Sequence, residues 1–174
     1  MPVSLCGKIP LIVSPDDRQA HDTKQATMRL TLKTDYALRT LLYLAKQPER
    51  LASIGEIATH YAISENHLVK VVHELGRKGF IDTIRGKGGG IRFNPATNEA
   101  RVGDIVRAME DDFALVDCFK DPAPEHPCLL TGDCRLQNIL DHALQAFFSH
   151  LDQYQFKDLL KEPAAAWQTI QFQR

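Results

Sequence analysis

The chain has 174 residues, of which 44% are hydrophobic and 25% are charged, so it can build one compact domain with appendages around a substantial core. No run approaches the roughly 18 consecutive apolar residues of a membrane-spanning helix, and the N-terminus lacks the features of a secretory signal. We therefore expect a cytoplasmic protein that has no membrane partner.

The net charge of −1 is distributed unevenly along the chain. Residues 28–92 carry eleven Lys or Arg against six Asp or Glu, whereas residues 93–174 carry seven against thirteen. A basic first part fits an electrostatic footprint for nucleic acid, and an acidic second part does not fit the same polyanion. An ordinary uneven surface is the alternative interpretation until motifs are added.

Residues 1–27 contain no sustained periodicity, and we expect them to form a disordered extension or to be a non-native start. Helical spacing of apolar residues predicts the first helix over residues 34–46, capped by Thr34. The run Ser53-Ile54-Gly55-Glu56 is a capping box, in which the Ser and Glu side chains satisfy backbone donors reciprocally. It predicts the start of a short second helix.

A third helix is predicted after a brief turn at Ala62-Ile63. Ser64 is placed to cap this helix, and Gly79 suits a left-handed residue just after its end. One face of the helix is apolar and contains Leu68, Val71, Val72 and Leu75. Two short capped helices separated by a brief turn predict a helix-turn-helix.

A β-hairpin is predicted next, with strands over residues 80–84 and 91–93. Its loop combines Arg85 and Lys87 with four glycines, including Gly88, which permit close backbone approach to a phosphate or groove wall. A phosphate-cradling enzyme loop would need G-x-G-x-x-G or G-x-x-x-x-G-K-[ST], and neither pattern is satisfied. We interpret the hairpin as a wing, with a flexible hairpin tip as the alternative.

The third helix carries hydrogen-bond donors and acceptors near its N-terminus, opposite the apolar face. In helix-turn-helix proteins this edge enters the major groove, where each good base contact is worth roughly 1–3 kcal/mol of discrimination. A solvated polar face is the alternative for this helix taken alone. The predicted DNA-binding residues of the helix and the wing are Ser64, Asn66, His67, Lys70, Arg77, Arg85, Lys87, Gly88 and Arg92.

The remaining predicted elements are a connector over residues 95–101, a short amphipathic helix, a loop over residues 111–133 and a long helix from Arg135 to about Gln153. Apolar residues recur along the long helix at spacings of three and four, forming a seam whose preferred partner is a second copy of the chain. The seam contains Leu136, Leu140, Ala143, Phe147 and Leu151. A less regular segment follows, with a short helix through Phe156, Leu159 and Leu160.

These elements predict a mainly α-helical fold with a small β-wing, in which a winged helix-turn-helix domain precedes a long dimerisation helix. The predicted segments are the extension over residues 1–27, the DNA-binding domain over 28–110, a cysteine-containing loop over 111–134, the dimerisation helix with a short following segment over 135–160, and a tail over 161–174.

Three of the four cysteines lie close together in the sequence, at Cys118, Cys128 and Cys134, whereas Cys6 stands alone. Three clustered thiols in a reducing compartment suggest a metal centre. Thiolates are the usual ligands of iron-sulfur clusters, whereas structural zinc usually takes four protein ligands in tight pairs that this chain lacks. Buried inert cysteines, and zinc with His126, are the alternatives that the spacing leaves open.

Several motifs in order resemble the NsrR family of iron-sulfur repressors, over residues 28–160. Each motif alone is unspecific, but the combination is highly specific. The matching residues are Met28-Arg29-Leu30-Thr31, Thr34-Asp35-Tyr36-Ala37-Leu38-Arg39, Arg85-Gly86-Lys87-Gly88-Gly89-Gly90, Cys118, Cys128 and Cys134-Arg135-Leu136.

The resemblance implies a homodimer that binds an operator in double-stranded DNA and responds to nitric oxide. It also implies one cluster per subunit, expected to be 4Fe-4S with 2Fe-2S as the alternative, held by the three cysteines and the partner's Asp35. Without the resemblance, a carboxylate at this helix start would be explained by the helix dipole. Related IscR-like members have a histidine where this chain has Gln137, and RirA-like members tend to have Asn at position 35.

The expected mechanism is that nitric oxide attacks the iron held by the hard carboxylate, and that cluster loss or nitrosylation releases DNA. A regulator of the same family that responds to iron or cluster status is the alternative. An iron-sulfur electron-transfer protein is a rival from another class, and a DNA-binding regulator with structural or redox-active cysteines is a further one. No nucleophile, base and oxyanion constellation emerges, so we expect a protein that is not an enzyme.

Overall fold

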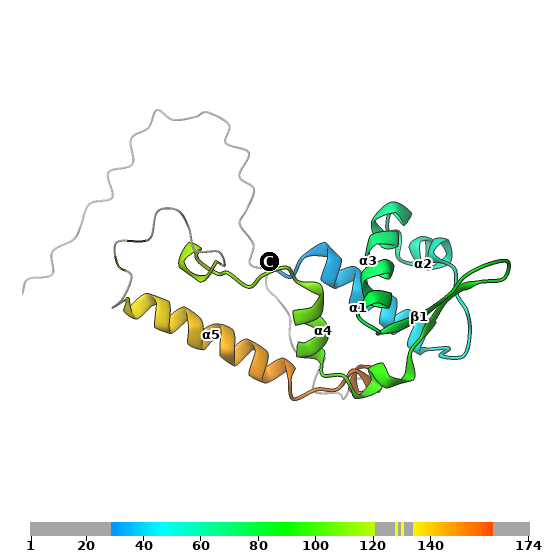
Figure 1. The fold of residues 1–174 in the computed structure, drawn as a ribbon. Coiled ribbons are helices and arrows are strands. Elements are labelled where there is room, and N and C mark those ends of the chain that lie inside the picture. Colours follow the sequence, from blue (N-terminus) through cyan, green and yellow to red (C-terminus); the bar gives the residue numbers. More distant parts are fainter. Residues whose placement is uncertain (1–28, 121–127, 129, 131–133, 162–174) are drawn as a thin grey trace, which may run out of the picture.

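The computed structural model describes residues 29–120, 128, 130 and 134–161. Figure 1 shows a compact domain that contains the first four α-helices and a β-hairpin, and a long helix that projects away from it. The mainly helical fold with a small β-wing is confirmed. The predicted extension over residues 1–27 and all but the first residue of the predicted tail over 161–174 lie outside the described residues.

Helix α1 spans Leu32–Ala45 and begins two residues before the predicted start. Thr31 is its N-cap, because its hydroxyl accepts a hydrogen bond from the Thr34 backbone N–H at 3.4 Å. Thr34, the predicted cap, is instead a fully buried residue within the helix. The prediction was wrong because two threonines three residues apart both suit a cap, and packing against the core decides between them.

Helices α2 (Ile54–Tyr61) and α3 (Glu65–Arg77) form the helix-turn-helix. Ser53 caps α2 as predicted, accepting from the Glu56 backbone N–H at 3.1 Å. The carboxylate of Glu56 bonds to other partners, Tyr43 and Arg50, so the reciprocal half of the capping box is not formed. The chain turns between the helices at a residue in the left-handed conformation, Ala62.

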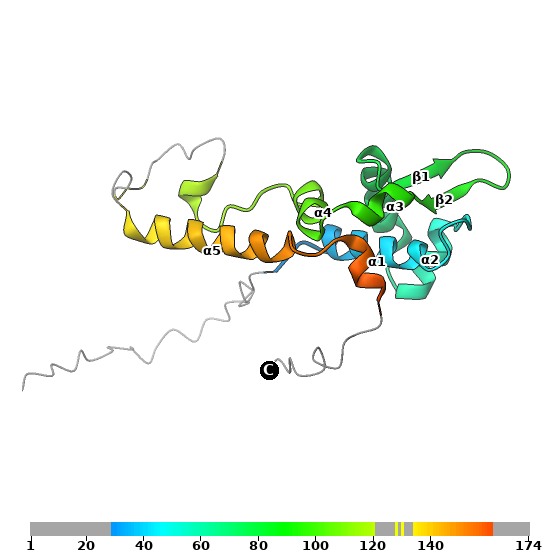
Figure 2. The ribbon, with the colours of Figure 1, turned by 90° about the horizontal axis from the view of Figure 1, so that it is seen from below.

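The wing consists of antiparallel strands β1 (Ile81–Ile84) and β2 (Gly90–Phe93), and Figure 2 shows it projecting from the compact domain. A β-bridge joins Ile91 to Ala52 by two backbone hydrogen bonds of 2.9 Å, so the base of the wing is tied to the segment that precedes α2. A side chain at Gly90 would place its Cβ 2.7 Å from the Ala52 carbonyl oxygen, so the close approach requires glycine there.

The chain then forms η1 (Pro95–Glu99), helix α4 (Val102–Met109) and the single turn η2 (Asp117–Phe119). A partly described segment separates η2 from helix α5 (Arg135–Leu151). The short 3-10 helix η3 (Phe156–Leu160) follows α5. None of the described helices is both long and apolar enough to cross a membrane.

The segment after α5 returns to the compact domain and completes its core. Phe156 is fully buried, and its ring lies 5.5 Å from that of Phe93 in β2. Its backbone N–H donates to the Ala100 carbonyl at 2.8 Å, and the Tyr154 carbonyl accepts from the Val102 N–H at 2.9 Å. The sequence predicted only a short helix here, yet this segment provides one of the largest side chains of the core.

A second contact joins α5 to α4. The Arg107 guanidinium donates two hydrogen bonds to the Asp152 carboxylate, at 2.9 and 2.7 Å, and lies 4.2 Å above the Phe148 ring. The pair raises the pKa of Arg107 and lowers that of Asp152, mainly through these hydrogen bonds. A Cβ at Gly103 would lie 1.9 Å from the Asp152 carboxylate, so the C-terminal end of α5 is seated directly on α4.

We expect Phe156→Ala to lower the free energy of unfolding by about 3 to 5 kcal/mol, because it removes a buried ring and leaves a cavity beside Phe93. Urea titration monitored by circular dichroism would measure this. The matched control is Leu160→Ala in the same turn, whose side chain is 41% exposed and whose loss should cost less than about 0.5 kcal/mol. Equal effects of the two substitutions would contradict the assignment of Phe156 to the core.

Candidate DNA-binding surface and metal-ligating residues

Helix α3 presents one buried and one exposed face. Asn66 and His67, on the edge predicted to enter the major groove, and Lys70, predicted to contact a phosphate, are all exposed. Ser64 occupies the N-cap position, but its side chain makes no capping hydrogen bond, which leaves the hydroxyl available for another partner. The C-terminal end of the helix lies against the wing, since a Cβ at Gly76 would be 3.3 Å from the Thr83 hydroxyl.

The predicted DNA-binding cations fall into two groups. Arg77 pairs with Glu74 at 2.6 Å and lowers the pKa of that carboxyl, and Arg92 pairs with Asp82 across the wing at 3.1 Å. The others are Lys70 on α3 and two residues of the wing tip, Arg85 and Lys87. These three are exposed, and no ion pair involves them within the part of the chain that the structure describes. They are therefore the cations best placed to meet an external anion.

The wing tip owes its shape to glycine. Gly86 and Gly88 have φ values of +102° and +82°, which other residues rarely adopt. No atom lies within 4 Å of a Cβ placed at Gly88, so the backbone there is open to a partner. The turn thus exposes peptide groups between Arg85 and Lys87, two cations for which no ion pair is found among the described residues.

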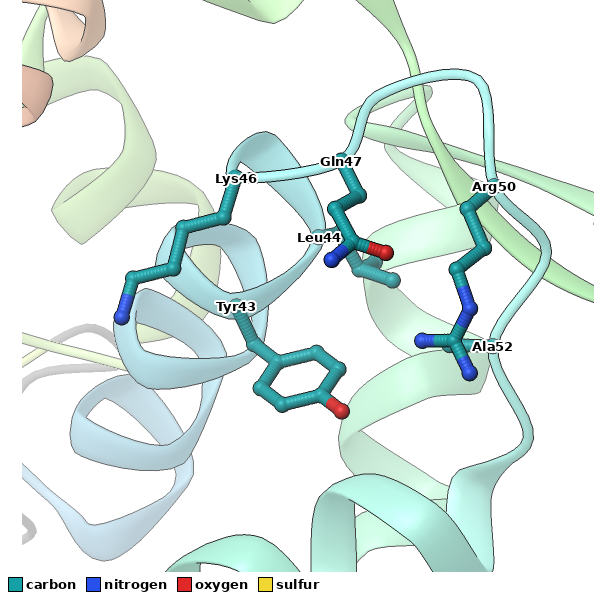
Figure 3. Close-up of a pocket in the computed structure, with 6 residues that line it drawn as sticks. All are labelled: Tyr43, Leu44, Lys46, Gln47, Arg50 and Ala52. Atoms are coloured by element: carbon teal, nitrogen blue, oxygen red, sulfur yellow. The ribbon is translucent and has the colours of Figure 1, made fainter.

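A polar network that sequence reasoning missed fixes α2 to α1. Tyr43 donates to a Glu56 carboxylate oxygen at 2.5 Å, and Arg50 donates to both carboxylate oxygens, at 2.6 and 3.1 Å. Figure 3 shows the Tyr43 hydroxyl and the Arg50 guanidinium converging beside a cavity of about 100 Å³. The Arg50 and Tyr43 hydrogen bonds lower the pKa of Glu56, and the Glu56 carboxylate raises that of Tyr43. The network holds the first turn of α2 in place.

The predicted metal-ligating residues occupy separate places in the described chain. Cys118 lies in η2 and Cys134 at the N-cap of α5, both half-buried, and Cys128 is exposed. No three Cys, His, Asp or Glu side chains gather as a metal site within the described ranges. Figures 1 and 2 show that α1, which carries Asp35, lies far from the first turn of α5.

Asp35 is half-exposed in the first turn of α1 and is held by Arg39 one turn later. The guanidinium makes two contacts with the carboxylate, at 2.9 and 2.8 Å. The helix start therefore gives Asp35 a structural partner within its own subunit, in addition to the helix dipole expected from the sequence. The half of Asp35 that is exposed remains accessible to a second chain.

An open groove of about 430 Å³ lies between the segment that runs from Phe113 to the end of η2 and the first three turns of α5. Phe113 and Phe119 line one side, and Gln137 and Asp141 line the other. Gln137, the position at which IscR-like members have histidine, is thus on the same side of α5 as the segment that carries Cys118.

Helix-turn-helix and wing together define a winged-helix transcriptional regulator that binds DNA. The family model for Rrf2, described as an iron-dependent transcriptional regulator, matches residues 30–162. The chain belongs to the Rrf2 family.

Its curated relatives include the HTH-type transcriptional regulators NsrR of Bacillus subtilis and of Halalkalibacterium halodurans. The first is 44% identical over 135 residues, which cover 77% of this chain and 91% of the relative. The second is 48% identical over 134 residues, which cover 76% and 90%. The resemblance to NsrR predicted from the sequence motifs is confirmed.

Solved structures agree on the fold. CymR, the global cysteine regulator of B. subtilis, is 25% identical, with a TM-score of 0.57 over 76% of this chain and 96% of that one. IscR of T. potens is 18% identical, with a TM-score of 0.59 over 80% and 96% of the two chains. This second likeness concerns the fold alone.

We expect Glu56→Gln to lower the melting temperature at pH 7, because the neutral amide loses the charge-assisted bonds from Arg50 and Tyr43. The pKa of Glu56 is lowered in the folded chain, so its contribution is present above the ordinary carboxyl pKa and is lost as the pH falls below it. The difference between the variant and the original chain should therefore shrink on acidification. Glu49→Gln, at an exposed loop position, is the control. A difference that is constant with pH would contradict the prediction.

Proposed function

We propose that the chain is a homodimeric repressor that binds operator DNA through α3 and the wing and senses nitric oxide through an iron-sulfur cluster. The proposal of a cluster rests on the position of Cys134. It occupies the N-cap of the longest helix without making a capping hydrogen bond, a position where Ser, Thr, Asp or Asn would stabilise the helix. A thiol at this position is best explained by a ligand role.

The donor set fits an iron-sulfur cluster in kind. Cys118, Cys128 and Cys134 supply three soft thiolates from one segment, and a structural zinc site would need a fourth close ligand. The first turn of α5 contains no acidic residue, so the positive end of its dipole is left for the negative charge of a thiolate-bound group. The fourth ligand in this proposal is Asp35 of the partner subunit, because α1, which carries Asp35, lies far from the first turn of α5 in the same chain.

Dimerisation would use α5. None of its residues is buried in the single chain, and Leu136, Ile139 and Phe147 are 59%, 57% and 42% exposed. They recur at spacings of three and eight, on one face of the helix. A symmetric pairing of two such faces would bury this apolar stripe and hold two α3 helices at the separation of about 34 to 36 Å that half-sites one DNA turn apart require.

The two ends of α5 would link the cluster to the DNA-binding domain. Its C-terminal end is clamped to the DNA-binding domain by Arg107, Asp152 and Phe156, whereas its N-terminal end carries Cys134. When bound, the cluster would supply iron that reacts with nitric oxide. Release of the partner's Asp35 from its place beside the cysteines would untie the two DNA-binding domains, and their half-site spacing would no longer be enforced.

A regulator that responds to iron or cluster status is the second candidate, favoured by the family's description as iron-dependent. An iron-sulfur electron-transfer protein would give no role to the exposed cations of α3 and the wing. An enzyme would need a set of catalytic residues, and the sequence predicts no combination of nucleophile, base and oxyanion donors. We therefore include in the proposal that the chain is not an enzyme.

The test of the signal is an anaerobic nitric oxide titration followed by visible absorption, with iron and sulfide measured on the starting sample. We expect an absorption band that nitric oxide bleaches, together with loss of DNA binding in a gel-shift assay. Bleaching without DNA release would favour the electron-transfer reading. DNA release on iron chelation but not with nitric oxide would favour the iron-status regulator, and a chain that holds no iron after reconstitution would contradict the cluster.

We expect Asp35→Ala to lose iron to a chelator at least about tenfold faster than the original chain, because a direct ligand should matter at least as much as its supports. The matched control is Asp104→Ala, which removes another helix-start carboxylate paired with an arginine, Arg107. Iron release monitored with a ferrous chelator compares the two. Equal rates would leave Asp35 as a helix-start carboxylate only.

We expect Arg85→Ala and Lys87→Ala each to weaken binding of all DNA sequences by a similar factor. Each should also reduce the slope of log affinity against log salt concentration by about 1, because a lost phosphate contact releases fewer counterions. Fluorescence anisotropy at several salt concentrations measures the slope. Lys161→Ala, an exposed lysine outside the wing, is the control, and an unchanged slope in both wing variants would contradict the contact.

A further inference from the structure

The exposed face of α3 contains one apolar side chain among polar ones. Exposed residues recur along the helix at spacings of three and four, at Asn66, Val69, Lys70, His73 and Arg77. Val69 is 46% exposed, although the neighbouring Leu68, Val71 and Val72 are buried. It lies one turn after Asn66 and directly before Lys70, in the middle of the surface assigned to base reading.

Neither the fold nor the helix gains from a valine at this place. Val69 is outside the hydrophobic core and outside the partly buried residues that pack against it. A β-branched residue forms helix less readily than Ala, Lys or Gln, and it leaves apolar surface in water. Single exposed apolar residues are ordinary on a protein surface, but this one lies between Asn66, whose amide is of the kind that pairs with adenine, and the cation Lys70.

We propose that Val69 specifies a thymine, by packing its methyl groups against the thymine C5-methyl in the major groove. The inference rests on the proposed DNA-reading role of α3. Among the bases, thymine alone presents a methyl group on the major-groove edge, whereas cytosine carries only a hydrogen at the same C5 position. A cytosine at this position would therefore leave the valine methyl groups without an apolar partner.

The neighbours of Val69 on α3 support its contact with a base in the major groove. Asn66, one turn earlier, can pair with adenine in a bidentate manner, and the nearby cation Lys70 can reach a phosphate. Asn66 and Val69 would therefore read an adenine edge and a thymine methyl group in an A·T-rich half-site. Lys70 would fix the register of the helix on the DNA backbone.

The experiment uses the full chain purified anaerobically, and the probe is a duplex that the chain selects from a random double-stranded DNA library. Each thymine of that duplex is replaced in turn by deoxyuridine, which keeps its base pairing and lacks only the methyl group. We expect one thymine in each half-site at which the replacement weakens binding by about fourfold, the factor for one buried methyl-sized group. We expect Val69→Ala to weaken binding to the thymine duplex and to abolish the deoxyuridine effect at that site alone.

Val69→Ala should fold normally, because the position is exposed and alanine favours helix more than valine does. The matched control is Leu160→Ala, which truncates another exposed apolar residue away from α3 and should leave the deoxyuridine profile unchanged. If Val69→Ala and the original chain give the same deoxyuridine profile, the assignment of Val69 is overturned while DNA binding by α3 stands. If the original chain selects no duplex at all, both this assignment and the proposed function are overturned.

Discussion

The packing of Phe156 against Phe93 is the contact on which the rest of the molecule depends. It places a side chain from beyond α5 in the same core as the second strand of the wing. Backbone bonds from Tyr154 to Val102 and from Phe156 to Ala100 align the returning chain, and the Arg107–Asp152 pair seats the end of α5 on α4. The helix that carries Cys134 is thus a lever attached at one end to the DNA-binding domain.

Local signals in the sequence predicted the fold well. Ser53 caps α2, Gly79 adopts a φ of +80° after α3, and the glycine-rich run forms the turn of the wing, because each of these features depends on residues a few positions apart. The start of α1 was misplaced because Thr31 and Thr34 carry the same local signal. Packing of Thr34 in the core, which no local pattern records, makes Thr31 the cap.

Contacts between distant residues could not be predicted in the same way. Tyr43 and Arg50 reach Glu56 because the loop between α1 and α2 folds back, and Arg107 meets Asp152 across 45 positions of sequence. Both partners in each case are common surface residue types. The predicted DNA-reading residues of α3 could be placed because helical periodicity assigns a face. The proposed metal site joins the cysteines to Asp35 of the partner subunit, and no single-chain pattern can position a second subunit.

The place of Phe156 in the core also has a consequence for synthesis on the ribosome. Chains emerge from the N-terminus, and domains generally fold as units once their residues are available. Here the DNA-binding core stays incomplete until the cysteine segment and α5 have both been made, because its last large side chain follows them. Nascent chains therefore complete the DNA-binding core only after the segment that carries Cys118, Cys128 and Cys134 has been made, and a shortened product ending before residue 156 would lack Phe156 from this core.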